Sequence, residues 1–171
     1  MAQTNDARFY AEYWAAYNRY LDIAGIPNTT KGTEDEFVLH VFESYTDVCK
    51  YVHVASCARC EDEHIGVTYP HICIEFVFRT KAGVSVDDAC FDALKQRRAD
   101  IELELGEPLN WDIPRDRFYG YKLPVLKEAD IDNREDWPNQ FKWMADRVVL
   151  FRRVFIKYLD TVLYPIMAGN R

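Results

Sequence analysis

Hydrophobic residues recur every three or four positions in three long stretches of the chain, which is the period of a helix with one buried face. The first stretch covers residues 6–24 and ends at Gly25 and Pro27, because both residues interrupt helices. The second runs over 85–105, and the third begins at residue 137 and continues to Pro165. We therefore predict an N-terminal, a middle and a long C-terminal helix, each with one apolar face.

Between the first two helices the pattern changes to short runs of β-branched and aromatic residues, the composition typical of strands. Three such runs occupy residues 37–42, 51–54 and 72–78. The first run also fits a helical stripe, so its assignment as a strand rests on composition. Apolar and polar residues alternate again at 109–113 and 119–123, which predicts two further strands paired with each other.

This order of elements predicts an α+β fold in which an antiparallel sheet meander packs against the N-terminal, middle and long C-terminal helices. The chain has 171 residues, of which 49% are hydrophobic, and we expect a single domain over residues 1–171. Phe, Tyr and Trp make up 15% of the sequence, so aromatic rings must supply much of the core. The same rings could cover a dimer interface, and the sequence leaves the oligomeric state open.

The sequence has neither an apolar run long enough to span a membrane nor the basic and apolar segments of a secretion signal. We therefore expect a cytoplasmic protein that makes no membrane contact. The five cysteines lie at positions 49, 57, 60, 73 and 90. An odd number of scattered cysteines in a chain of this size indicates reduced thiols rather than disulfides.

One group of residues has the composition of a metal site. Two thiols between two imidazoles could complete a tetrahedral zinc site, and these residues are His53, Cys57, Cys60 and His64. His71 and Cys73 on the next strand offer alternative ligands. Cysteines also pack as small hydrophobic residues, so ordinary hairpin residues are the competing interpretation. Apart from this zinc alternative, we expect no cofactor.

Motifs for other chemistries are missing from the sequence. No serine lies in a nucleophile elbow, and the seven glycines form neither a Walker loop nor a dinucleotide-binding turn. A thiolate–imidazole pair from the Cys/His group would need a residue that orients the imidazole, and the sequence indicates none. We therefore favour a binding protein over an enzyme, with a small zinc- or thiol-dependent enzyme as an alternative.

The formal net charge of −7 argues against a general attraction to nucleic acid or to anionic membranes. Two acidic triplets could instead bind a basic partner, with solubilising loop charge as the competing interpretation. They are Glu34, Asp35, Glu36 and Glu61, Asp62, Glu63. Five basic residues near one edge of the C-terminal helix could contact phosphates or pair with acids of the same chain. They are Lys142, Arg147, Arg152, Arg153 and Lys157.

The C-terminal half of the chain has a distinctive set of motifs: a helix with Phe-x-x-Leu and Ile-Glu, then Leu-Gly, a Trp-containing strand, and a late helix that opens near Trp-x-x-x-x-x-Trp-Met. In this pattern the chain resembles domain-of-unknown-function family 4268, an uncharacterised microbial domain often found after the nuclease domain of restriction-endonuclease-like proteins. The resemblance is strongest over residues 90–144 and extends loosely to Phe9, Trp14 and Tyr17. It implies a fold but no catalytic residues, and the Cys-rich stretch at 57–64 departs from the pattern.

These observations leave two classes of function. In the first, the protein is a non-catalytic interaction protein that binds a basic, nucleic-acid-handling protein in a microbial or phage defence or counter-defence setting, of the restriction type that the resemblance implies. It would then act as an accessory subunit or an inhibitor. In the second, it is a nucleic-acid-binding accessory domain that uses the basic edge of its last helix. The acidic charge and the lack of catalytic motifs favour the first class.

Overall fold

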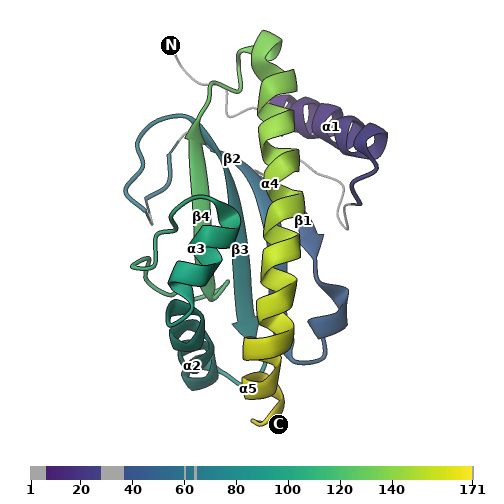
Figure 1. The fold of residues 1–171 in the computed structure, drawn as a ribbon. Coiled ribbons are helices and arrows are strands. Elements are labelled where there is room, and N and C mark those ends of the chain that lie inside the picture. Colours follow the sequence, from purple (N-terminus) through teal and green to yellow (C-terminus); the bar gives the residue numbers. More distant parts are fainter. Residues whose placement is uncertain (1–6, 28–36, 60, 64, 171) are drawn as a thin grey trace.

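Four antiparallel strands form one sheet in the order β1-β2-β3-β4 (Figure 1). The computed structural model describes residues 7–27, 37–59, 61–63 and 65–170. Within them the strands are β1 (Phe37–Val41), β2 (Cys49–Arg59), β3 (His71–Thr80) and β4 (Tyr121–Glu128). Each strand pairs with the next one along the chain, although helices separate β3 from β4.

The α-helices of the described residues are α1 (Ala7–Ala24), α2 (Val84–Lys95), α3 (Arg98–Leu105), α4 (Trp137–Tyr158) and α5 (Tyr164–Ala168). Short 3₁₀ turns lie at Glu43–Tyr45 and Arg134–Asp136, and a π turn at Leu159–Leu163 joins α4 to α5. In Figure 1, α4 runs along the sheet, and α1 crosses the N-terminal half of α4. None of the helices in this part of the chain combines the length and apolar character that a membrane crossing requires.

The side chains of the two central strands alternate between the faces of the sheet. Val54, Ile74 and Phe76 lie on the face that α4 covers, and all three are fully buried. The ring of Phe76 stacks on the ring of Phe155 in α4, with 4.0 Å between the ring centroids. The hydrophobic core therefore lies between the sheet and α4, as the apolar stripe of the C-terminal helix requires.

Helix α1 is fixed to this core by aromatic rings whose polar ends find partners. The Tyr13 hydroxyl donates a hydrogen bond of 2.9 Å to the side-chain oxygen of Gln140 in α4. The Tyr17 hydroxyl lies 3.0 Å from the hydroxyl of Ser56 in β2. Since both tyrosines are fully buried, these bonds offset the cost of removing their hydroxyls from water.

The structure confirms the predicted α+β fold, with an antiparallel sheet against N-terminal, middle and long C-terminal helices. The strand at 37–42 is confirmed as β1. The predicted middle helix is interrupted at Gln96 and Arg97, where the chain turns between α2 and α3.

The predicted pairing of strands at 109–113 and 119–123 is wrong. Residues 109–113 form no strand, and β4 pairs with β3 instead. The carboxylate of Glu102 accepts hydrogen bonds from the Leu109 backbone N–H at 3.0 Å and from the Trp111 indole N–H at 2.8 Å. A side chain of α3 thus holds residues 109–113 in place. Their alternation of apolar and polar residues reflects alternating burial, without strand pairing.

Candidate functional site

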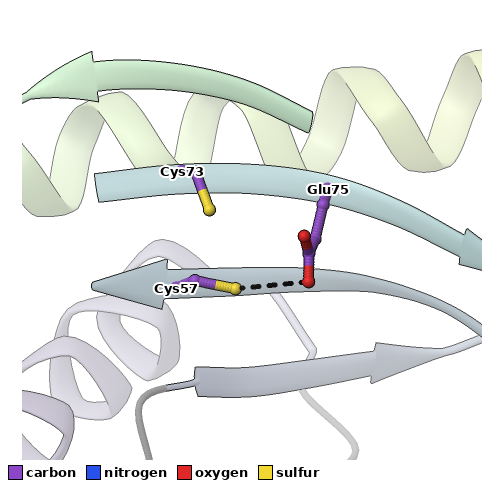
Figure 2. A group of neighbouring side chains, drawn as sticks. All are labelled: Cys57, Cys73 and Glu75. Atoms are coloured by element: carbon purple, nitrogen blue, oxygen red, sulfur yellow. Dashed lines mark hydrogen bonds between the residues drawn. The ribbon is translucent and has the colours of Figure 1, made fainter. Parts of the chain in front are cut away.

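The face of the sheet opposite α4 carries a small group of reactive side chains, and we call this side the outer face. Cys57 on β2 and Cys73 and Glu75 on β3 point to it (Figure 2). They reach this face because each is an odd-numbered residue, whereas the even-numbered neighbours on these strands point to the core. Leu39 of β1 and Leu126 of β4 pack around the two cysteines.

The three side chains are close enough to act together. Cys57 and Cys73 are directly opposite each other in the antiparallel register, and Glu75 follows two residues later. The Cys57 thiol donates a hydrogen bond of 3.7 Å to a carboxylate oxygen of Glu75. The two sulfur atoms and a Glu75 oxygen all lie within 4.8 Å of one another. We name these three residues the thiol–carboxylate cluster.

Arg59 closes the cluster at one side. One end of its guanidinium lies 2.6 Å from a carboxylate oxygen of Asp62, and the other end lies 3.7 Å from Glu75. Glu75 is only 5% exposed, so an unpaired carboxylate would be costly there. The guanidinium supplies the counter-charge that makes this burial acceptable.

The surroundings of Cys73 disfavour its thiolate form. The hydrogen bond with Cys57 raises the pKa of the Cys73 thiol, and burial raises it further. The pKa of Arg59 is also raised, first by its electrostatic interaction with Cys57, while burial acts in the opposite direction. A thiol that stays protonated at neutral pH is a weak nucleophile, so Cys73 lacks the thiolate character of a catalytic cysteine.

The structure does not bring the predicted zinc ligands His53 and Cys57 together. Cys57 lies within β2, and His53 lies four residues earlier on the same strand. At about 3.3 Å per residue, their backbone positions are roughly 13 Å apart, too far to share one ion. The other two predicted ligands, Cys60 and His64, lie outside the described residues.

Of the two alternative ligands, Cys73 does join Cys57 in the cluster. His71 lies on the outer face of β3, two residues before Cys73, and is fully buried. Its Nδ1 lies 2.9 Å from the carbonyl oxygen of Tyr69, while its Nε2 has no hydrogen-bond partner among the described residues. Glu75 was missed by the sequence reasoning, because only the strand register places it beside Cys57.

His53 has its own effect on stability. Burial, followed by the charge of Lys122, lowers its pKa to about 4. An unfolded histidine titrates near pH ~6.5, so the stability that neutral His53 contributes is complete above that pH and is lost as the pH falls toward 4. We expect it to account for about 1 kcal/mol of lost unfolding free energy between pH 7 and pH 5.5, measured by urea denaturation. A His53→Gln variant with the same pH dependence as wild type would contradict this assignment.

Of the two predicted acidic triplets, the one at residues 61–63 lies in the connection between β2 and β3. Glu61 and Glu63 are exposed, and no salt bridge involves either of them within the part of the chain that the structure describes. Asp62 is paired with Arg59 and is partly shielded. The other predicted triplet, Glu34, Asp35 and Glu36, lies outside the described residues.

Four of the five predicted phosphate-binding residues of α4 already have partners. Three form salt bridges within the chain: Lys142 with Asp146 at 2.7 Å, Arg147 with Glu107 at 3.1 Å, and Lys157 with Glu104 at 2.6 Å. Arg152 donates to the backbone carbonyls of His40 at 3.0 Å and Val41 at 3.2 Å. Arg153 is exposed. The predicted basic edge is therefore largely neutralised within the protein.

Comparison with known proteins identifies a family but no characterised relative. The profile of the family described as Domain of unknown function (DUF4268) matches residues 64–159, which is more than half of the 171-residue chain. No curated protein and no solved structure shows significant similarity to the chain. The matched region runs from within the β2–β3 connection through α4, so it includes Cys73 and Glu75 but not Cys57. The chain belongs to the DUF4268 family.

Proposed function

We propose that the protein is a non-catalytic interaction protein that binds a basic surface of a nucleic-acid-handling protein. We further propose a microbial or phage defence or counter-defence setting of the restriction type. One observation carries the proposal: acidic side chains from two separate segments gather at one end of the sheet.

The β2–β3 connection and the segment after β4 lie next to each other at this end (Figure 1). In the sheet register, His71 at the start of β3 is opposite Arg59 on one side and Glu128 on the other. The backbone N–H of Ala129 donates to the Pro70 carbonyl at 3.2 Å. These backbone contacts place the points where the two acidic segments leave the sheet beside each other.

We define the acidic end as residues 61–63 and 127–136. It holds eight acidic and two basic residues and so has a net charge of −6, compared with −7 for the whole chain. The exposed acids among them are Glu61, Glu63, Glu128, Asp130, Asp132 and Glu135. Such a concentration of one charge raises the rate of encounter with a basic surface and repels phosphates.

The basic residues of α4 give less support to the nucleic-acid-binding alternative. To contact phosphates, Lys142, Arg147 and Lys157 would have to leave acidic partners in their own chain. Arg152 would have to give up two carbonyl acceptors. The carboxylates of Asp146, Glu107 and Glu104 would also stay beside any bound phosphates and repel them, which offsets part of the attraction.

A capture experiment with a paired charge reversal tests the proposal. Glu61→Lys/Glu128→Lys changes one exposed residue in each segment of the acidic end. We expect the wild-type protein to retain a basic nucleic-acid-handling protein from host lysate after nuclease treatment. The double variant should retain at least about tenfold less of this protein. Mass spectrometry of the retained proteins gives the readout.

The control variant is Glu43→Lys/Asp92→Lys, which makes the same charge change at exposed positions away from this end of the sheet. It should retain the partner as wild type does. Retention that disappears with nuclease, or that both double variants lose equally, would show that the acidic end is not the binding surface.

A further inference from the structure

We propose that Cys57, Cys73 and Glu75 form a binding site for a thiophilic divalent cation, with Zn²⁺ as the ion that these ligands suit best. Two thiolates and a carboxylate are common zinc ligands, whereas thiolates are poor ligands for Mg²⁺ and Ca²⁺. The site shares only Cys57 with the zinc set that the sequence predicts. It is also separate from the proposed partner-binding role of the acidic end.

The ligand atoms already lie close to the distances that a zinc site requires. Zinc–sulfur and zinc–oxygen bonds of about 2.3 and 2.1 Å place tetrahedral ligands roughly 3.5 Å apart. The two sulfurs and the Glu75 oxygen already lie within 4.8 Å of one another (Figure 2). The pairing of β2 with β3 places Cys57 opposite Cys73, with Glu75 two residues further on. Side-chain rotations that move the ligand atoms by about 1 Å would therefore bring all three around one ion.

The charges of the site fit a divalent cation. Before binding, the two thiols lie beside the carboxylate of Glu75, and the Arg59 guanidinium lies between this carboxylate and that of Asp62. Zinc binding forms two zinc–sulfur bonds and one zinc–oxygen bond, and it releases the two thiol protons to solvent. The Zn²⁺ ion replaces these two protons, so the net charge of the site is unchanged. A buried site that keeps its net charge avoids a large desolvation penalty.

The spacing along β3 limits the fourth ligand. His71 is buried on the same face of the sheet, with its Nδ1 2.9 Å from the Tyr69 carbonyl oxygen and no hydrogen-bond partner for Nε2 among the described residues. It lies four residues before Glu75 on the same strand, so their backbone positions are roughly 13 Å apart, too far to share one ion. The ion that Cys57, Cys73 and Glu75 hold therefore keeps its fourth tetrahedral position for a water molecule.

Zinc titration of the full-length, reduced and chelator-stripped protein tests the site. We expect one Zn²⁺ per chain in competition with a chromophoric chelator, and Co²⁺ should show the thiolate charge-transfer absorption of tetrahedral coordination. Cys57→Ala/Cys73→Ala should weaken binding by about 100-fold or more, and Glu75→Gln by about tenfold or more. Circular dichroism shows whether each variant is folded.

The matched control is Cys49→Ala/Cys90→Ala, which removes two other buried thiols of the chain. It should bind zinc as wild type does. The proposal is overturned if the wild type binds no zinc under these conditions. It is also overturned if Cys73→Ala and Glu75→Gln bind normally while Cys60→Ala/His64→Ala does not, because the ligands would then lie in the β2–β3 connection.

Discussion

Phe155→Ala should lower the free energy of unfolding by about 4 kcal/mol. Phe155 lies in α4 and is fully buried. Its ring stacks on Phe76 of β3, with 4.0 Å between the ring centroids, and lies tilted against Phe151 of its own helix at 5.5 Å. Removing the ring takes away contacts to both layers of the core and leaves a cavity between them. Neighbouring side chains can fill it only if α4 moves toward the sheet, which its other contacts resist.

Urea denaturation followed by circular dichroism measures this loss, and Ile156→Ala is the control. Ile156 is the next residue of α4 and is 45% exposed, so its truncation should cost less than about 1 kcal/mol. Comparable losses for the two variants would contradict the view that stacking between α4 and the sheet dominates the core.

The helices were predictable because their hydrophobic stripes coincide with the buried face. In α4, the stripe read from the sequence contains Phe141, Met144, Val148, Phe151 and Phe155, and all five are buried in the core. The buried face of a helix can be predicted without knowing what it packs against, because packing on any apolar surface requires the same spacing of apolar residues.

The strands were predicted less well, because burial and strand pairing leave similar patterns. Leu109, Trp111 and Ile113 are buried and alternate with exposed residues, as a half-buried strand would. The sequence could not show that Glu102 would take the backbone N–H of Leu109. Alternation identifies the buried side chains but not the partners of the backbone hydrogen bonds.

The extent of β2 was underestimated for a related reason. Residues 55–58, Ala-Ser-Cys-Ala, have small side chains with little intrinsic strand preference, and the predicted strand ended before them. Pairing with β1 and β3 holds them in the sheet. Since the thiol–carboxylate cluster depends on this register, its cysteines were recognisable as candidate ligands, but Glu75 was not.

A second buried site should be nearly as sensitive as Phe155. Asp87 in the first turn of α2 is fully buried, and one carboxylate oxygen accepts from the Thr80 backbone N–H at 2.7 Å and from the Thr80 hydroxyl at 2.8 Å. The other oxygen accepts two N–H groups of Arg115, at 3.0 and 2.6 Å. This carboxylate joins the end of β3, the start of α2 and the loop before β4, which are far apart in the sequence.

We expect Asp87→Asn to lower the free energy of unfolding by about 3 kcal/mol. Asparagine keeps the shape, but it removes the charge that neutralises Arg115 and turns an NH₂ group toward an existing donor. Asp92→Asn, at an exposed position of the same helix, should change the unfolding free energy by less than about 0.5 kcal/mol.

The uncompensated Arg115 should account for much of the Asp87→Asn loss, which a double-mutant cycle can measure. Arg115 is itself mostly buried, with 17% of its side chain exposed, so it cannot regain full hydration once Asp87 is neutral. In the Asp87→Asn background, Arg115→Gln should therefore cost far less than it does in wild type. The coupling energy should exceed about 1 kcal/mol, and strictly additive losses would mean that the ion pair contributes little and that the bonds to Thr80 carry the effect.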